Sequence, residues 1–194
     1  NIKQIYVLVR TKPGITIQER LNNEVFKSKI FDRMINDNFD KNMDNFLRYV
    51  HSKVTPIAGD MLGHRNNLDI VPSDIDQIVK NGGIDIVFHS AATVDFTERI
   101  DIAIDINVLG PLRLLTMAKN IFNVKCFVQV SSTYSSSNQP SGRKVYEKIY
   151  PLEFDPHALI QSVQGGKSEI ELANITNRAL GTYPNTYCLT KHIS

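Results

Sequence analysis

Cysteine, histidine clusters and long apolar runs are scarce in this sequence of 194 residues. Its two cysteines, Cys126 and Cys188, are too few for a disulfide framework and are typical of reduced thiols in a cytosol-facing protein. No stretch approaches the ~18 apolar residues that a membrane helix needs, and no signal-peptide pattern opens the chain. The five histidines are scattered singly, so no metal-ligand spacing is present and we expect no metal.

An excess of one charge is also absent. The formal net charge is +2, and the chain is 42% hydrophobic and 22% charged. This balance excludes a disordered tail and a nucleic-acid-binding arm, and it favours one globular domain over residues 1–194. Without an initiating methionine, the sequence is expected to be an internal piece of a longer protein.

Short β-rich runs alternate along the chain with helical stretches. Strands are predicted within residues 4–10, 53–60, 83–94 and 124–132. The last two are nearly continuous in apolar residues, which is typical of strands buried on both faces. Strands that alternate with helices indicate the α/β class, here a Rossmann-like, doubly wound parallel sheet covered by helices on both sides.

Apolar spacing predicts the intervening helices. They are expected over residues 16–38, through Phe46 and Val50, over 71–81 with Ser73 as the N-cap, and over 98–120 with a kink at Pro111.

The chain carries candidate cofactor-binding residues after the first two predicted strands, where open α/β sheets bind their ligands. Arg10 and Lys12 provide two cations and no carboxylate, a pattern that favours the 2′-phosphate of NADP(H) over the free ribose of NAD(H); the alternative is a solvated basic turn. Asp60 either accepts a hydrogen bond from the adenine amino group or caps the following turn.

The third and fourth strands end in small and hydroxyl-bearing residues. Ala91 and Ala92 would let a cofactor approach the backbone closely, while His89 is interpreted as a packed histidine and not a base. Ser131 and Ser132 follow the fourth strand. A hydroxyl there can donate to a substrate carbonyl oxygen, although turn chemistry in a serine-rich loop is the alternative.

Tyr187 and Lys191 in "YPNTYCLTK" are four residues apart, so a helix places them on one face. A free phenol has a pKa of ~10, and a nearby ammonium lowers it. The lysine can also hold the hydroxyls of a nicotinamide ribose. Following a serine-ended strand, this pair indicates a proton donor with its tuning cation.

Seven motifs in this order resemble the extended short-chain dehydrogenase/reductase superfamily, and within it the alcohol-forming fatty acyl-CoA reductases of the male-sterility family. They are "YVLVR", "PIAGD", "DIVFHSAATVDF", "INVLG", "FVQVSS", "KVYEKIYP" and "YPNTYCLTK". The "PNT" before the tyrosine and the following Thr190 narrow the match to this branch.

The resemblance implies a role for several residues. Tyr187 would be the proton donor, Lys191 the ribose-binding lysine, and Ser132 the carbonyl-binding hydroxyl in place of the family's threonine, with Thr133 as the fallback. Asn107 would organise the site and a proton-relay water. Asp60 would bind adenine and Arg10 would lie near the 2′-phosphate.

The implied reaction is the NADPH-dependent reduction of a fatty acyl-CoA to a fatty alcohol through an aldehyde. Two alternatives stay open. One is a relative acting on a sterol, nucleotide sugar or flavonoid, and the other is a catalytically inactive nucleotide-binding scaffold. The family implies the cytosolic side of peroxisomal or endoplasmic-reticulum membranes, with any membrane association through regions outside this sequence and no nucleic-acid partner.

The family's first strand and its Gly-rich, pyrophosphate-binding turn have no counterpart in this sequence, and neither does the family's C-terminal region. That first strand is central in the usual strand order, so we expect two half-sheets with unpaired inner edges. The piece alone is therefore expected neither to fold stably nor to reduce anything.

Overall fold

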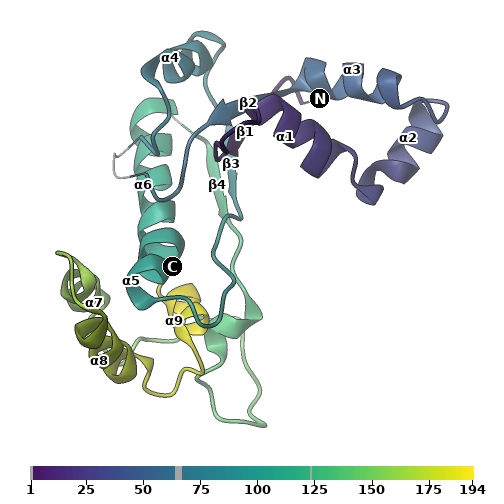
Figure 1. The fold of residues 1–194 in the computed structure, drawn as a ribbon. Coiled ribbons are helices and arrows are strands. Elements are labelled where there is room, and N and C mark those ends of the chain that lie inside the picture. The colour runs from purple at the N-terminus through teal and green to yellow at the C-terminus, as the bar shows by residue number, and fades with distance from the viewer. Residues whose placement is uncertain (1, 64–66, 123) are drawn as a thin grey trace. The chain divides into compact units, whose positions relative to one another are not determined.

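The computed structural model describes residues 2–63, 67–122 and 124–194. The chain divides into two compact units, Asn1–Asn81 and Gly82–Ser194 (Figure 1). The α/β class with parallel strands is confirmed. The strands pair within each unit as a two-stranded sheet, the pairing expected of a sheet without its central strand.

The sheet of the first unit joins β1 (Ile5–Val9) and β2 (Val54–Ala58). The strands are parallel, with Ile5 opposite Val54 and Val9 opposite Ala58. Parallel strands need a crossover of a dozen or more residues, and the helices between β1 and β2 provide it.

The crossover is a broken series of helices, and the single helix expected over residues 16–38 is wrong. It consists of α1 (Ile17–Arg20), a π-helical turn (Leu21–Phe26), a 3₁₀ turn (Lys29–Phe31) and α2 (Asp32–Asn38), followed by α3 (Met43–Lys53). Ser28 begins a new turn because its hydroxyl accepts a hydrogen bond from the amide of Ile30, which competes with continued helix.

The core of the first unit forms between β1 and these helices. Its buried members are Val9, Leu21, Phe26, Ile35, Phe46 and Val50. Leu21 and Ile35 belong to the apolar spacing that predicts a helix over residues 16–38. Val25 and Ile30 of the same pattern are 40% and 79% exposed, and Phe26 is buried instead, so the broken helices bury only part of the predicted face.

The last helix of the first unit is α4 (Pro72–Lys80). Ser73 is not its N-cap, contrary to the sequence prediction; Val71 holds that position without a side-chain hydrogen bond. Pro72 occupies the first turn, where its missing N–H removes one donor that a cap would serve.

The sheet of the second unit joins β3 (Ile86–His89) and β4 (Cys126–Gln129) in parallel, with His89 opposite Gln129. The prediction that these strands are buried on both faces is wrong. Ile86 is 51% exposed and Phe88 is 73% exposed. Side chains alternate across a strand, so one face is open here while the face of His89 is covered.

A nearly continuous helical column follows β3 and matches the prediction for residues 98–120. It comprises α5 (Ile100–Ile104), a π-helical turn (Asp105–Leu109), α6 (Gly110–Met117) and a second π-helical turn (Ala118–Phe122). Pro111 lies in the first turn of α6, directly after the wider turn. Because proline lacks an N–H, the irregularity beside it is expected.

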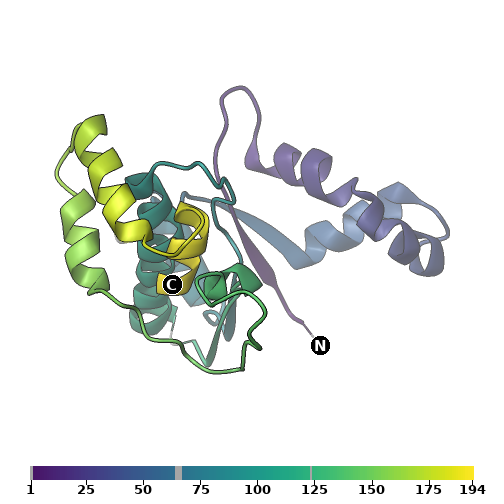
Figure 2. The same ribbon diagram turned by 90° about the horizontal axis from the view of Figure 1, so that it is seen from below.

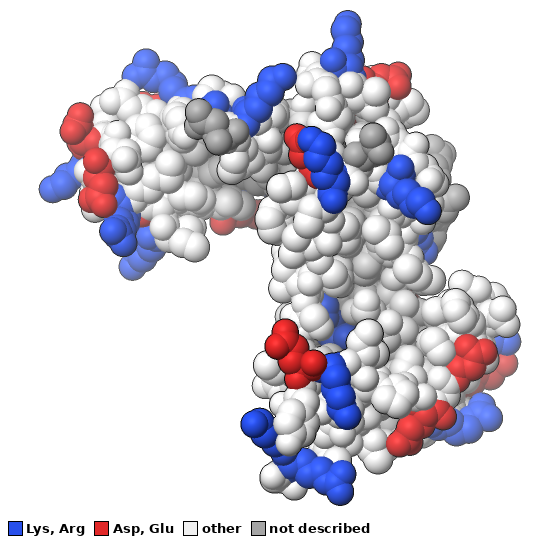
Figure 3. All heavy atoms as spheres, turned by 180° about the vertical axis from the view of Figure 1, so that it is seen from behind, with Lys and Arg blue, Asp and Glu red and all other residues white. Residues whose placement is uncertain are grey.

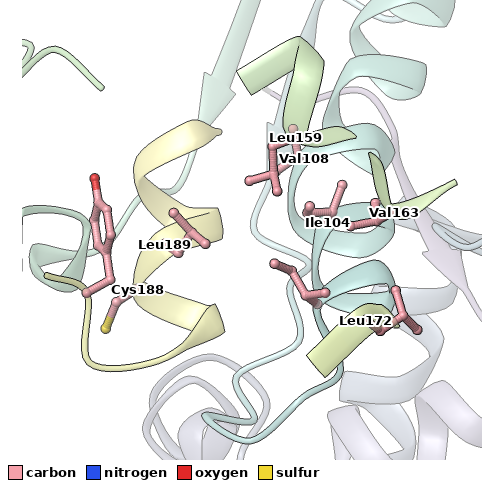
Figure 4. Packing of buried hydrophobic residues seen from close by; sticks show 9 residues of the cluster. Ile104, Val108, Leu159, Val163, Leu172, Cys188 and Leu189 are labelled. Atoms are coloured by element: carbon pink, nitrogen blue, oxygen red, sulfur yellow. The ribbon is translucent and has the colours of Figure 1, made fainter. Parts of the chain in front are cut away.

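Three further helices pack against this column: α7 (Pro156–Val163), α8 (Glu169–Leu180) and α9 (Thr186–Ile193) (Figure 2). Figure 4 shows the buried side chains that join them. These are Ile104 and Val108 from the column, Leu159 and Val163 from α7, Leu172 from α8, and Cys188 and Leu189 from α9. This core fixes the position of α9, the helix that carries the candidate catalytic pair.

Charged side chains of both signs are interspersed over the face shown in Figure 3. This agrees with the near-neutral net charge of the sequence. Among the helices in the described part of the chain, none combines the length and the apolar character that crossing a bilayer requires.

Candidate active site

The start of α9 is fixed by the residues before Tyr187. Asn185 is the N-cap, and its side-chain oxygen accepts a hydrogen bond from the amide of Cys188 at 2.9 Å. The hydroxyl of Thr186 donates to the backbone oxygen of Glu98 at 2.8 Å. The "PNT" motif therefore caps the helix and ties it to the loop after β3.

Lys191 lies one helical turn beyond Tyr187 and is only 5% exposed. Its ammonium donates to the backbone oxygen of Val130, the residue after β4, at 3.0 Å. Burial lowers the pKa of the Lys191 ammonium, because the charged form loses hydration. The lysine is thus anchored at the carboxyl end of β4.

The ring of Tyr187 contacts two other aromatic rings. Its centroid lies 5.5 Å from that of Phe96 and 6.2 Å from that of Tyr134. Tyr134 belongs to the 3₁₀ turn (Thr133–Ser136) that follows β4. The tyrosine is thus held at the same strand end as the lysine.

Ser132 lies between these two contacts in the sequence, two residues after Val130 and two before Tyr134. Its hydroxyl oxygen accepts a hydrogen bond from the amide of Tyr134 at 3.2 Å, which leaves the hydroxyl hydrogen to donate. Ser132 is half-buried and caps the 3₁₀ turn, so the turn-chemistry alternative describes its local role. Thr133, the fallback donor, is exposed in that turn.

Asn107 is 1% exposed, and its amide connects two segments. Its oxygen accepts a hydrogen bond from the amide of Thr93 at 2.9 Å. Its nitrogen donates to the hydroxyl of Thr190 at 3.0 Å and to the backbone oxygen of Thr93 at 3.2 Å. The side chain therefore ties the loop after β3 to α9, beside Tyr187 and Lys191.

Sequence reasoning missed the structural role of Thr190. It is fully buried, and its hydroxyl receives the hydrogen bond from Asn107. From the sequence alone, Thr190 serves only to narrow the resemblance to one branch of the superfamily. Its place directly before Lys191 was the signal that could have revealed this role.

His89 is 3% exposed and lies at the end of β3. Its Nδ1 is 2.7 Å from the side-chain oxygen of Gln129, and its ring stacks on Phe127 at 6.4 Å. Burial lowers its pKa. These contacts support the interpretation of His89 as a packed residue. Ala91 and Ala92 follow it in the loop, where Ala91 is exposed.

One member of the basic pair near β1, Lys12, forms an ion pair that the sequence pattern did not indicate. The ammonium of Lys12 lies 3.1 Å from Glu24, which Arg20 also binds at 2.7 Å. The hydrogen bond from Arg20, and then that from Lys12, lower the pKa of Glu24 to about 2. A carboxylate is therefore present beside Lys12, whereas the exposed Arg10 guanidinium has no ion-pair partner among the described residues.

Asp60 follows β2 and binds its own loop. Its side-chain oxygen accepts a hydrogen bond from the amide of Leu62 at 3.0 Å. This is the turn-capping interpretation of the two that the sequence left open. The other oxygen of the carboxylate can still accept a hydrogen bond.

Solved structures similar to this chain are reductase domains. A terminal R domain from the myxalamid PKS-NRPS biosynthetic pathway matches with a TM-score of 0.56 and 21% identity, over 98% of this chain and 36% of that chain. A thiolation-reductase di-domain from an archaeal non-ribosomal peptide synthetase matches with a TM-score of 0.51 and 26% identity, over 98% and 31%. The fold is therefore that of an α/β domain of the extended short-chain dehydrogenase/reductase type.

Among curated proteins, the chain is similar to one group of reductases within this fold type, the fatty acyl-CoA reductases. The chain is 32% identical over 194 residues to fatty acyl-CoA reductase 1 of Xenopus laevis and 32% identical over 193 residues to that of Homo sapiens, covering 100% of this chain in both comparisons. It is 31% identical over 191 residues to fatty acyl-CoA reductase 2 of Mus musculus, covering 98% of this chain. The chain spans about a third of the length of these relatives, 34% in each.

The family of NAD-binding domains described as "Male sterility protein" matches residues 1–194. The chain belongs to this family, and the resemblance inferred from its motifs is confirmed.

Proposed function

We propose that this chain forms part of an NADPH-dependent reductase that converts a fatty acyl-CoA to a fatty alcohol through an aldehyde. The observation that carries the proposal is the position of α9 beside the segment after β4. Lys191 binds Val130, two residues before Ser132, and the ring of Tyr187 contacts Tyr134, two residues after Ser132. The names of the relatives support the substrate class.

The residues of the second unit fit a nicotinamide cofactor. An ammonium has three donors, and the backbone oxygen of Val130 accepts one from Lys191, so two remain for ribose hydroxyls. The small side chains of Ala91 and Ala92 leave room for close approach to the loop after β3. When bound, the reduced nicotinamide supplies the hydride that the carbonyl carbon accepts.

In the first unit, Arg10 is proposed to bind a 2′-phosphate and Asp60 the adenine amino group. The guanidinium of Arg10 supports this role, because guanidinium matches phosphate geometry and none of the described residues forms an ion pair with it. Lys12 contributes less to the proposal, since Glu24 already neutralises it.

The side chains of the second unit would then stabilise the negative charge that develops on the substrate oxygen and supply the proton. The hydroxyls of Ser132 and Tyr187 donate hydrogen bonds to the carbonyl oxygen, on which negative charge develops during reduction. Tyr187 transfers its proton to that oxygen, and the Lys191 ammonium stabilises the resulting phenolate. Coenzyme A would then leave the first adduct as its thiolate while the phenolate of Tyr187 regains the hydroxyl proton, which gives the aldehyde. A hydride from a second NADPH, with the same tyrosine as proton donor, would give the alcohol.

Replacing Tyr187 in the full-length protein tests the proposal. Tyr187→Phe removes the proton donor but keeps the ring that packs on Phe96 and Tyr134. The rate of alcohol formation from palmitoyl-CoA should fall by about a hundredfold or more, the usual contribution of a general acid, with NADPH binding retained. Gas chromatography of the products and a fluorescence titration with NADPH measure the two quantities.

Tyr49→Phe is the matched control, because Tyr49 is 44% exposed and far along the chain from α9. It should leave the rate unchanged. Near-normal alcohol formation by Tyr187→Phe would remove the tyrosine from its role. A wild-type protein that binds NADPH but reduces no acyl thioester would favour the scaffold, or a reductase of another substrate class.

A further inference from the structure

A cavity of about 440 Å³ lies in the second unit, bounded by α8, by the segment that precedes α9 and by the loop before α5. Its apolar lining includes Phe96, Ile100, Leu172, Ala173, Leu180 and Pro184. The volume is within the range of ~300–1,000 Å³ that is usual for pockets that bind small molecules.

The floor of the cavity belongs to the core of the unit. Ile100 is fully buried and Leu172 is 3% exposed, and both pack in the cluster shown in Figure 4, where Leu172 is labelled. Side chains held in a packed core keep their shape. The cavity therefore has a fixed apolar floor.

Phe96 connects the cavity to the candidate catalytic tyrosine. The phenylalanine lines the cavity and its ring contacts that of Tyr187 at 5.5 Å between centroids. Pro184, Asn185 and Thr186 also line the cavity and directly precede Tyr187. The cavity thus begins beside the position at which a substrate carbonyl would receive its proton.

The loop that carries Phe96 is held by its own polar groups. The side-chain oxygen of Asp95 accepts hydrogen bonds from the amide and the hydroxyl of Thr97, both at 2.8 Å. Thr93 donates to the carboxylate of Glu98 at 3.2 Å, and Thr186 donates to the backbone oxygen of Glu98 at 2.8 Å. The Phe96 wall is consequently formed before any ligand binds, which lowers the entropic cost of binding.

The charge at the rim argues against a phosphate-bearing occupant. Arg99 lines the cavity, but its guanidinium is already bound by Asp101 through two hydrogen bonds of 2.7 and 2.8 Å. Asp101 neutralises this guanidinium, and Glu98 and Glu169 also line the cavity, so the rim carries no net positive charge that would attract a phosphate. The lining therefore suits a hydrocarbon chain better than the nucleotide part of coenzyme A.

We infer that this cavity receives the acyl chain of the thioester, with Phe96 as the wall that it shares with Tyr187, and that Phe96 and Ala173 help to set the chain length that the enzyme accepts. The inference rests on the proposed function and deepens it by assigning a site to the apolar end of the substrate. Long chains should gain affinity from the cavity, because each buried methylene stabilises the complex.

Ala173→Phe in the full-length protein tests the inference. Ala173 is exposed on α8, so a larger side chain fills the cavity without disturbing the core. The ratio kcat/KM for stearoyl-CoA should fall by about tenfold or more, while that for octanoyl-CoA should change by less than about threefold. Ala173→Leu should give an intermediate loss.

Ala158→Phe is the matched control. It makes the same change at an exposed position of the neighbouring helix α7, outside the cavity lining. It should leave the chain-length profile of the wild type unaltered. An Ala173→Phe profile equal to that of the control, in an active and folded protein, would overturn the inference.

Binding measurements separate this inference from the proposed function. Calorimetric titration with the unreactive thioethers S-octyl-CoA and S-octadecyl-CoA needs no turnover. Tighter binding of the octadecyl compound, lost in Ala173→Phe, supports the cavity even if the wild type reduces nothing. Equal binding of the two compounds by the wild type would overturn the cavity assignment, whatever the protein reduces.

Discussion

A single hydroxyl, that of Thr190, holds together the residues around the candidate catalytic pair. It accepts a hydrogen bond from Asn107 at 3.0 Å and donates to the backbone oxygen of Thr186 at 2.8 Å. A hydroxyl can do both at once, whereas a methyl group can do neither. Within the described part of the chain, Thr190 is the residue through which the amide of Asn107 binds α9.

Thr190→Val tests this connection. The substitution keeps the shape of the side chain but leaves the buried amide of Asn107 without one partner, so the free energy of unfolding should fall by about 1–3 kcal/mol. The value of kcat should fall as well, because α9 loses one of its described ties to the loop after β3 and keeps that from Thr186 to Glu98. Urea denaturation and steady-state kinetics of the full-length protein measure the two effects.

Thr176→Val is the matched control for Thr190→Val. Thr176 also donates to a backbone oxygen of its own helix, that of Leu172 at 2.7 Å, and it is only half-buried. Its replacement should cost less stability. Equal losses in the two variants would show that the bond to Asn107 stabilises nothing.

Buried Lys191 should make stability depend on pH. Burial lowers the pKa of Lys191 in the folded state below the ordinary ~10.4. Between the folded and the unfolded pKa, the folded state therefore binds fewer protons than the unfolded state. The cost of the buried charge is present below the folded pKa and disappears as the pH rises through it. The free energy of unfolding of the wild type should therefore rise relative to that of Lys191→Met between neutral pH and about pH 10.

Chemical denaturation of both full-length proteins at a series of pH values measures this difference. Lys148→Met, at an exposed position, should track the wild type throughout the series. A difference between wild type and Lys191→Met that stays constant with pH would contradict the assignment of the shift to burial.

At the scale of elements, we predict that the N-cap of α9 affects catalysis as well as stability, because this helix carries Tyr187 and Lys191. Asn185→Ala removes the acceptor for the amide of Cys188 and should cost about 1 kcal/mol of stability. It should also lower kcat, because Tyr187 lies in the first turn that the cap holds. Thermal unfolding and the rate of alcohol formation report on the two losses.

Asn42→Ala is the control for this cap. Asn42 caps α3, where it accepts a hydrogen bond from the amide of Asn45 at 3.1 Å. A similar loss of stability with normal kcat is expected. If both variants lost activity in proportion to stability, the cap of α9 would have no separate effect on the site.

The sequence predicted where the strands and helices lie better than it predicted where they begin and end or which of their side chains are buried. Apolar spacing located all four strands and the column around Pro111. It missed the break at Ser28 and the cap of α4, because both depend on which polar group competes for a backbone amide. It also overestimated the burial of Phe88, since an apolar run shows which residues could be buried and not what covers them.

The candidate site was predictable where it follows from local geometry. Helical spacing places Tyr187 and Lys191 on one face, and a strand end places Ser132. The contacts of Lys191 with Val130 and of Asn107 with Thr190 join residues 61 and 83 positions apart. Such tertiary pairs leave no periodic signal in a single sequence.

At the scale of the whole molecule, the two units have separate sheets of two strands each. Two-stranded sheets are marginally stable at best. Large apolar side chains such as Ile86, Phe88 and Val94 are also exposed in the second unit. From these features we predict that residues 1–194 do not form a stable unit by themselves.

Expression of residues 1–194 alone tests this expectation. The isolated chain should bind the dye ANS, unfold without a cooperative transition and fail to bind NADPH, because its apolar strand faces remain open. Differential scanning calorimetry and a fluorescence titration provide the measurements. A sharp unfolding transition together with NADPH binding would refute it.

The two thiols differ sharply in access, since Cys126 is exposed on β4 whereas Cys188 is fully buried on α9, one residue after the candidate catalytic tyrosine. A maleimide dye should label the first within seconds and reach the second only when the helix detaches. The molecule thus carries its own reporter pair, in which the exposed thiol of Cys126 reacts at once and the rate of labelling of Cys188 measures how often α9 detaches.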